Sequence, residues 1–184
     1  MKILGISGSL REASHNRRLL QVAASELPDG TSFELYTGLG DIPAYREEDE
    51  DGETPESVGA LRAVLHDADA VLLATPEYNG SIPGQLKNAL DWASRPFPDN
   101  ALRNKPVAVI GASTGLFGAV WAQAELRKVL TTIGAKVVDA ELPVGQAHDA
   151  FTDDDRLADP DLHKALAQIV GQLAEAASAA SEAA

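Results

Sequence analysis

The sequence contains no cysteine. Without cysteine the chain cannot form a disulfide, use a thiolate as a nucleophile or bind zinc through sulfur. Its four histidines, His15, His66, His148 and His163, are scattered without the spacing of metal ligands. We therefore expect no protein-bound metal ion.

Basic residues are scarce: 15 Lys and Arg stand against 28 Asp and Glu, for a net charge of −13 at pH 7. Because a nucleic acid is bound by clustered Lys and Arg, this imbalance argues against nucleic acid as a partner. Two acidic runs, 46–53 and 152–161, lack the alternating ligands, central Gly and distant Glu of a calcium loop. We interpret both runs as solvated loops.

Apolar runs are short, and none is long enough to cross a bilayer. Met1–Ile6 resembles a first strand more than a signal peptide. We expect no membrane partner and a soluble protein, most simply a cytoplasmic one. The 184 residues suit one buried core. We predict a single domain over residues 1–176, followed by an Ala-rich tail, 177–184, that frays because it has almost nothing to bury.

Apolar runs typical of strands alternate along the chain with stretches of helical periodicity. The predicted strands are 2–7, 32–36, 70–75, 106–112 and 135–138, and the predicted helices are 16–26, 55–66, 83–93, 118–133 and 160–176. Thr54-Pro55 and Asp159-Pro160 mark two of the helix starts. This alternation predicts an α/β protein with a parallel sheet covered by helices on both faces. Five strands in this arrangement suggest the order 2-1-3-4-5.

In that order the chain reverses direction between the first and third strands, and ligands bind at such a switch point, beyond the carboxyl ends of the strands. The loops after strands 1, 3 and 4 should therefore converge. These three loops are also the richest in Gly, Ser, Asn and Pro. The sequence thus predicts a ligand site at this edge of the sheet.

The first loop, SGSLREASHN, runs from Ser7 to Asn16 and opens a helix. A helix N-terminus leaves backbone N–H groups free to bind an anion. The guanidinium of Arg11 can pair with two phosphate oxygens, while Ser9, Ser14 and Asn16 can donate to the others. The loop is neither a Walker loop nor a dinucleotide-binding glycine motif, which favours a single terminal phosphate. The alternative is an ordinary capped turn with Arg11 on the surface.

The second loop begins the stretch TPEYNGSIPGQLKNALDW, residues 75–92. Its prolines stiffen the backbone, and its glycines, Gly80 among them, allow the backbone to approach a ligand closely. Tyr78 offers a flat apolar face beside the polar atoms of Glu77 and Asn79, a combination suited to a planar heterocycle. The alternative is that Tyr78 packs on a neighbouring helix and the Pro and Gly residues only form turns.

The third loop, GASTGLFGA at residues 111–119, again ends a strand and opens a helix. Backbone N–H groups near Ser113, Thr114 and Gly115 could face the electron-rich oxygens of a ring. The alternative is a simple glycine-rich connection.

Three segments together resemble the NAD(P)H-dependent FMN reductase family, a flavodoxin-like group that includes chromate, quinone and azo-dye reductases. The segments are GSLREASHN, PEYNGSIPGQLKNALDW and GASTGLFGAVWAQAELRKVL, and the resemblance runs from Met1 to about Leu157. The resemblance implies a flavodoxin-like three-layer sandwich and FMN as the cofactor.

The resemblance also implies where the cofactor lies. The first loop would hold the FMN phosphate, the second would border the isoalloxazine and ribityl, and the third would lie near the pyrimidine edge. The implied cofactor-binding residues are Ser9, Arg11, Ser14 and Asn16 in the first loop, Pro76, Glu77, Tyr78, Asn79 and Gly80 in the second, and Ser113, Thr114 and Gly115 in the third.

Members of the family form dimers or tetramers, so the resemblance implies a homodimer or homotetramer. The helices beginning at Pro83 and Gly118 would supply the contact, and Trp121 would belong to the interface or to the core. The expected activity is hydride transfer from NADH or NADPH to flavin N5, without a catalytic side chain. The hydride would then pass to an acceptor such as a quinone, an azo compound, chromate or free flavin.

Two other functions stay open at this point. One is a flavodoxin-like electron carrier, although such carriers usually hold the phosphate in a loop without arginine, and Arg11 departs from that pattern. The other is a protein that binds FMN without turnover.

Overall fold

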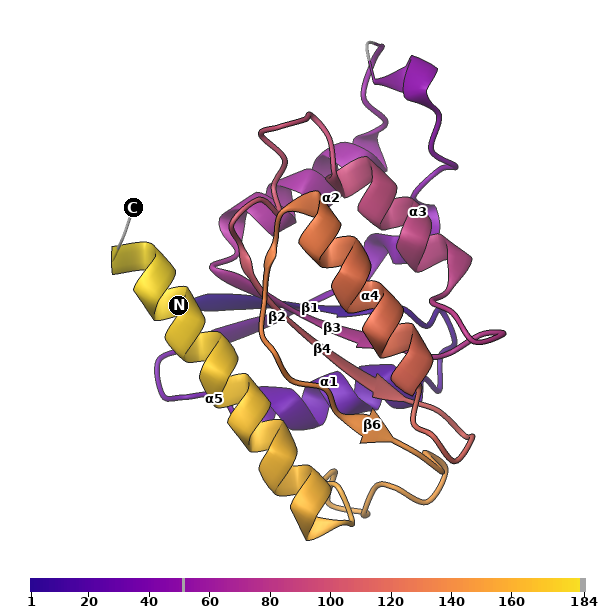
Figure 1. Cartoon of the computed structure of the whole chain (residues 1–184), viewed down its shortest axis with the longest axis vertical. Helices are drawn as coiled ribbons and strands as arrows, with labels where there is room; N and C mark the ends of the chain where they lie inside the picture. The colour runs from indigo at the N-terminus through magenta and orange to yellow at the C-terminus, as the bar shows by residue number, and fades with distance from the viewer. Residues whose placement is uncertain (51, 183–184) are drawn as a thin grey trace.

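The computed structural model describes residues 1–50 and 52–182, and its core is a parallel sheet between two helical layers (Figure 1). The strands are β1 (Lys2–Ser7), β2 (Ser32–Tyr36), β3 (Ala70–Thr75), β4 (Pro106–Ala112), β5 (Lys136–Val137) and β6 (Pro143–Val144). Their order is β2-β1-β3-β4-β5, with β6 also paired to β4. The predicted class and strand order are confirmed, and the first four strands have the predicted bounds.

The edge beyond β4 differs from the prediction of one strand over 135–138. β5 pairs with the beginning of β4, at Pro106 and Val107, whereas β6 pairs with its end, at Gly111 and Ala112. Two short strands therefore share the fifth position of the sheet. A two-residue strand that begins with proline carries no alternating pattern, so the sequence offered no signal for β6.

The helices are α1 (His15–Ser25), α2 (Glu56–Asp67), α3 (Gly84–Ala93), α4 (Val120–Ile133) and α5 (Pro160–Glu182), with short 3₁₀ helices η1 (Gly38–Asp41) and η2 (Glu47–Asp49). Figure 1 shows α1 and α5 on one face of the sheet and α2, α3 and α4 on the other. No helix within residues 1–50 and 52–182 has the length and apolar character needed to cross a membrane.

Helix α5 extends beyond its predicted end at Ala176 and continues to Glu182. Ala177 is buried, so the helix still packs on the core where the sequence indicated almost nothing to bury. Fraying of the 177–184 tail in solution stays a prediction, and residues 183–184 lie outside the described part of the chain.

The two proline-marked helix starts behave differently. Asp159 Oδ1 accepts hydrogen bonds from the backbone N–H groups of Asp161 at 2.8 Å and Leu162 at 3.4 Å, so Asp159 caps α5 as expected. Helix α2 begins at Glu56 with Pro55 in the N-cap position and has no side-chain cap. The predicted capping role of Thr54 is therefore wrong, because the helix begins one residue later than the motif suggests.

The sheet is buried on both faces. Side chains alternate along each strand, so Val71 and Leu73 of β3 join the core beneath α2, α3 and α4, while Leu72 joins the core beneath α1 and α5. Every residue of β3 and β4 is buried. This explains the nearly continuous apolar runs, which are typical of central parallel strands.

A buried glutamine fixes the start of α4 against the β5–β6 connection. Gln123 is fully buried, and its Nε2 donates to the carbonyl oxygens of Gly118 at 3.0 Å and Leu142 at 3.2 Å. Its Oε1 accepts from the backbone N–H of Leu142 at 3.0 Å. One side chain thus bonds to three backbone groups, one of which, the carbonyl oxygen of Leu142, also accepts from the N–H of Gly111 in β4 at 3.1 Å.

Replacing Gln123 with Leu should lower the free energy of unfolding by roughly 1–3 kcal/mol, because buried backbone groups lose their partners. Urea denaturation followed by circular dichroism measures the change. The control is Glu125→Leu, an exposed position on the same helix, where a change within about 0.5 kcal/mol is expected. Equal stability of Gln123→Leu and the wild type would contradict the anchoring role.

Candidate cofactor site

Parallel pairing brings the ends of three strands together. Ser7 at the end of β1 pairs with Ala74 of β3, and Thr75 at the end of β3 pairs with Gly111 of β4. The loops that leave these strands therefore begin side by side, at the edge to which the arrowheads point in Figure 1. The strand register thus brings together the loops after strands 1, 3 and 4, as predicted.

The first loop gathers three buried hydroxyls that are only weakly hydrogen-bonded. Ser7, Ser9 and Ser14 are each 5–6% exposed. Ser7 Oγ lies 3.5 Å from Ser14 Oγ and 3.4 Å from the carbonyl oxygen of Ser9. Normal O–H···O distances are about 2.7–2.8 Å, so these contacts are long. The hydroxyls can turn toward an anion at little cost.

Arg11 lies at the exposed side of this loop. Its backbone N–H makes a long contact to Ser9 Oγ at 3.4 Å. Within residues 1–50 and 52–182 its guanidinium has no carboxylate partner. The surface position fits both the phosphate interpretation and the capped-turn alternative. Ser14 does cap α1, accepting from the N–H of Arg17 at 3.2 Å.

Asn16 ties the first loop to the third. Its Nδ2 donates to the carbonyl oxygen of Ala112 at 2.9 Å, and its Oδ1 accepts from the N–H of Ala112 at 2.9 Å. The buried amide thus continues the hydrogen bonding of the end of β4. One amide N–H remains for a ligand, and the assignment of Asn16 as a phosphate ligand stays a prediction.

The second loop forms a tight turn at its tip. Tyr78 and Ser81 exchange two backbone hydrogen bonds, of 2.9 Å and 3.2 Å. Asn79 and Gly80 between them both have positive φ, 55° and 75°. Two positive φ angles define a type I′ turn, for which Asn-Gly is the favoured pair. The adjacent Asn79 and Gly80 are the sequence signal for this turn.

The turn leaves the ring of Tyr78 47% exposed. The alternative in which Tyr78 packs on a neighbouring helix is therefore not what this structure shows. Pro76, at the base of the loop, is buried. A rigid base and a projecting aromatic ring are what a surface for a planar ligand requires.

Glu77 has a role that the sequence did not reveal. Its Oε2 accepts hydrogen bonds from the backbone N–H groups of Trp121 and Ala122, both at 3.1 Å. Helix α4 has Ala119 in its N-cap position, with no side-chain cap of its own. A carboxylate at a helix N-terminus satisfies free N–H groups and the helix dipole. Glu77 thus locks the second loop to the helix that follows the third.

The third loop has fewer free N–H groups than expected. The N–H of Ser113 donates to the carbonyl oxygen of Val144 at 3.0 Å, and the N–H of Gly115 donates to Ser113 Oγ at 3.2 Å. Of the three predicted donors, only the N–H of Thr114 lacks an acceptor among the described residues. A contact between this loop and a ring oxygen would therefore use Thr114 first.

The segment from Pro143 to Ala147 packs against the third loop. The N–H of Gln146 donates to Gly115 O at 2.9 Å. Gly118 has φ 58°, and a Cβ on it would come within 2.3 Å of the carbonyl carbon of Pro143. Only glycine fits this combination of conformation and close approach. The sequence placed no site element here because β6 itself was not predicted.

Burial and neighbouring charge act on the histidine beside the first loop. Burial, with the positive charge of Arg11 as the next cause, lowers the pKa of His15 below its ordinary value. The fixed positive charge of the loop therefore comes from Arg11, since His15 is neutral at neutral pH.

Large apolar side chains surround these loops. Leu116, Phe117 and Trp121 are 71%, 61% and 54% exposed, and the rings of Phe117 and Trp121 meet edge to face at 5.2 Å. We call these three residues the apolar rim. Trp121 is exposed, so the core interpretation of its position is wrong, and the interface interpretation stays a prediction.

The fold defines a flavodoxin-like α/β protein, and the three loops form a candidate ligand site at the switch point of its sheet. The family described as NADPH-dependent FMN reductase matches residues 1–149. The chain belongs to this family.

Individual relatives agree with the family. The chain is 44% identical to an NAD(P)H-dependent FMN reductase of Pseudomonas aeruginosa over 160 residues, which cover 86% of this chain and 85% of that protein. It is 36% identical to a quinone reductase of Escherichia coli K12 over 140 residues, 76% of this chain and 74% of that protein. FerB, a flavoenzyme NAD(P)H:(acceptor) oxidoreductase from Paracoccus denitrificans, superposes with a TM-score of 0.84 at 36% identity, covering 96% of this chain and 97% of FerB.

Replacing Glu77 with Ala should lower the free energy of unfolding by about 1 kcal/mol, the usual cost of losing a helix cap. Urea denaturation without FMN is the measurement. Glu77→Gln, which keeps an oxygen acceptor but loses the charge, should fall between the wild type and Glu77→Ala. A Glu77→Ala protein of unchanged stability that binds FMN poorly would instead make Glu77 a cofactor ligand.

Proposed function

We propose that this protein is an FMN-dependent NAD(P)H oxidoreductase that reduces quinones and similar small acceptors. The observation that carries the proposal is the convergence of three loops beyond β1, β3 and β4, with buried, weakly bonded hydroxyls in the first loop. At the exposed side of that loop lies Arg11, which has no carboxylate partner among the described residues. Membership of the FMN reductase family supports FMN as the cofactor.

The first loop fits the phosphate of FMN. Ser9 and Ser14 would donate their hydroxyls, Arg11 would supply the charge, and the N-terminus of α1 would add backbone N–H groups. Asn16 would hold the loop against β4 and offer its remaining amide N–H. The buried hydroxyls of this loop make only long contacts, so they fit a phosphate to which they would donate.

The second and third loops fit the ring system. Pro76, Tyr78, Asn79 and Gly80 would line one side of the isoalloxazine and ribityl, and the N–H of Thr114 would reach a ring oxygen from the segment Ser113–Gly115. Bound FMN supplies the chemistry, accepting a hydride from NADH or NADPH and passing two electrons to an acceptor. The chain's own part is to position and orient, so we assign no general acid or base.

The acceptor would meet an open, largely apolar surface beside the flavin, bordered by the exposed ring of Tyr78. Such a surface recognises flat molecules by shape and stacking rather than by specific hydrogen bonds. Two relatives bear on its chemistry: the Escherichia coli protein is named a quinone reductase, and one from Burkholderia a 2-hydroxy-1,4-benzoquinone reductase. Quinones are therefore the proposed acceptors, with azo compounds, chromate and free flavin as further candidates.

A homodimer or homotetramer is also part of the proposal. The apolar rim lies at the start of α4, one of the two helices from which contact was expected. Exposed aromatic side chains in one patch are typical of a protein interface. A cytoplasmic location, where NAD(P)H is available, completes the proposed function.

Purified protein supplied with FMN, NADH or NADPH and a benzoquinone should oxidise the nucleotide for many turnovers. The decrease in absorbance of the reduced nicotinamide measures this oxidation. The protein eluate should also be yellow and contain FMN. Flavin binding without nucleotide oxidation would favour an electron carrier, and the absence of both would overturn the proposed function.

Replacing Arg11 with Ala should weaken FMN binding by about 1.5–3 kcal/mol, a loss of roughly tenfold or more in affinity, because a charged hydrogen bond to phosphate is removed. Quenching of FMN fluorescence measures the affinity. Lys164→Ala, an exposed position at the start of α5, is the matched control. An Arg11→Ala protein that retains FMN as well as the control would remove the phosphate assignment.

Replacing Trp121 with Glu should dissociate the oligomer, because a charge would be buried in the proposed contact. Light scattering coupled to size-exclusion chromatography measures the mass. Gln168→Glu, an exposed position on α5 that gains the same charge, is the control. A wild-type protein that is already monomeric at high concentration would contradict this part of the proposal.

A further inference from the structure

A second concave site lies at the opposite edge of the sheet from the three loops. A cavity of about 610 Å³ opens between the end of α2 and the connection from α3 to β4. Its charged lining residues are Arg62, His66, Arg95, Asp99, Arg103 and Lys105. We call it the basic cavity. Lys105 immediately precedes β4, so the length of that seven-residue strand, roughly 20 Å at about 3.3 Å per residue, separates it from the loops.

The sign of the charge in the basic cavity is the reverse of that of the whole chain. Four of its ten lining residues are Arg or Lys and one is acidic, whereas the chain as a whole has 15 basic and 28 acidic residues. Concentrating scarce positive charge in one hollow costs electrostatic repulsion among the cations. A site of this kind is stabilised by a bound anion.

Two of the cations are partly buried without a carboxylate. Lys105 Nζ donates to the carbonyl oxygens of His66, at 3.3 Å, and Ala68, at the end of α2. Arg62 donates from Nε and Nη2 to the carbonyl oxygen of Trp92, at 3.3 Å and 3.1 Å. Burial lowers the pKa of both side chains, and the nearby carboxylates act in the opposite direction, Glu50 on Arg62 and Asp69 and Asp67 on Lys105. Neither cation has a carboxylate within ion-pair distance among the described residues.

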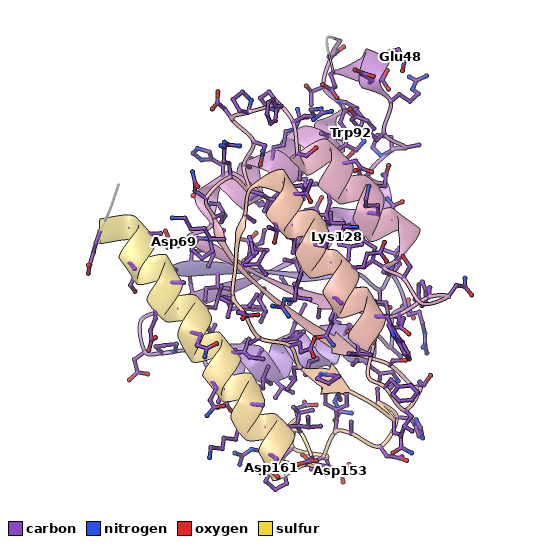
Figure 2. The ribbon with its side chains drawn as sticks, in the orientation of Figure 1. Glu48, Asp69, Trp92, Lys128, Asp153 and Asp161 are labelled. Atoms are coloured by element: carbon purple, nitrogen blue, oxygen red, sulfur yellow. The ribbon has the colours of Figure 1, made fainter. Side chains whose placement is uncertain are left out.

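The other two arginines differ in their partners. Arg103 is exposed and, among the residues that the structure describes, has no carboxylate within ion-pair distance. Arg95 pairs through Nε with Glu50 Oε1 at 2.7 Å, and Glu50 also accepts from the Tyr45 hydroxyl. Glu50 belongs to the acidic segment that projects from this end of the molecule, where Figure 2 labels Glu48 and Trp92. The carboxylate of Glu50 thus neutralises part of the positive charge of the basic cavity.

An aromatic ring lies beside the cations. Phe97 is 75% exposed, and it lines a second hollow of about 530 Å³ together with Arg62, Arg95 and Glu50. The two hollows share Arg62 and Arg95. Cationic forks next to an exposed ring suit a ligand with a polyphosphate at one end and a planar group at the other.

We propose that the basic cavity binds the polyphosphate group of a small anion, with a nucleoside di- or triphosphate as the ligand that also uses Phe97, and that Glu50 competes with this anion for Arg95. A nucleic acid does not fit, because the rest of the acidic surface repels a long polyanion. The site is independent of the proposed reductase activity, since it shares no residue with the three loops.

The test is calorimetric titration of sodium tripolyphosphate into the FMN-saturated full-length protein at low ionic strength. Saturating FMN keeps the phosphate probe away from the first loop. We expect one saturable site whose affinity falls as salt is added. Absence of saturable binding would overturn the proposal.

Two variants with the same change in net charge separate a built site from a general charge effect. Arg103→Glu should weaken tripolyphosphate binding by about tenfold or more, whereas Lys164→Glu, on α5, should change it little. Arg103→Gln, which adds no new charge, gives the same direction if the Glu variant is unstable. Equal weakening by Arg103→Glu and Lys164→Glu would overturn the proposal.

Two further measurements address the competitor and the source of the phosphate. Glu50→Gln should tighten tripolyphosphate binding several-fold, because Arg95 loses its internal partner. Unchanged or weaker binding would overturn the proposal that Glu50 competes with the anion for Arg95.

A comparison of ATP with tripolyphosphate tests the nucleotide ligand. ATP that binds more tightly than tripolyphosphate, and loses that advantage in Phe97→Ala, supports a nucleotide ligand. Equal affinities, insensitive to Phe97, overturn the nucleotide assignment and leave inorganic oligophosphate as the ligand of the site.

Discussion

The proposed cofactor site depends on the register between β1, β3 and β4. Pairing of Ser7 with Ala74 and of Thr75 with Gly111 sets three loops at one height on one edge of the sheet. A slip of one residue would turn every buried side chain to the opposite face. Because β3 and β4 are buried on both faces, such a slip would exchange the side chains packed in the two cores and lose their close packing, which keeps the loops aligned.

Side-chain hydrogen bonds then connect the loops that follow the aligned strands. Asn16 joins the first loop to the end of β4, and Glu77 joins the second loop to the start of α4. Gln123 holds α4 to the segment that supports the third loop. These contacts satisfy backbone groups at the ends of strands and helices, among them the end of β4 and the first turn of α4, where an unpaired polar group would be costly. The same contacts restrict the loops before any cofactor arrives.

Charge is distributed unevenly in this acidic protein. Arg11 marks the proposed phosphate position at the carboxyl edge, and the basic cavity gathers Arg62, Arg95, Arg103 and Lys105 at the amino edge. Two members of the second group, Arg62 and Lys105, are partly buried, and burial lowers the pKa of both side chains. Arg11 is exposed. Because the rest of the surface is acidic, these two positively charged places attract an approaching anion more than their surroundings do.

The sequence by itself determined the first four strands, the strand order and the three loops, because apolar periodicity and Gly, Ser and Pro signals act within a few residues of one another. It also supported the family through its loop motifs. Tertiary structure alone decided the split edge formed by β5 and β6, the continuation of α5 past Ala176 and the capping of α4 by Glu77. It alone assembled the basic cavity as well. These features join residues distant along the chain, and such contacts exist only after the sheet has brought them together.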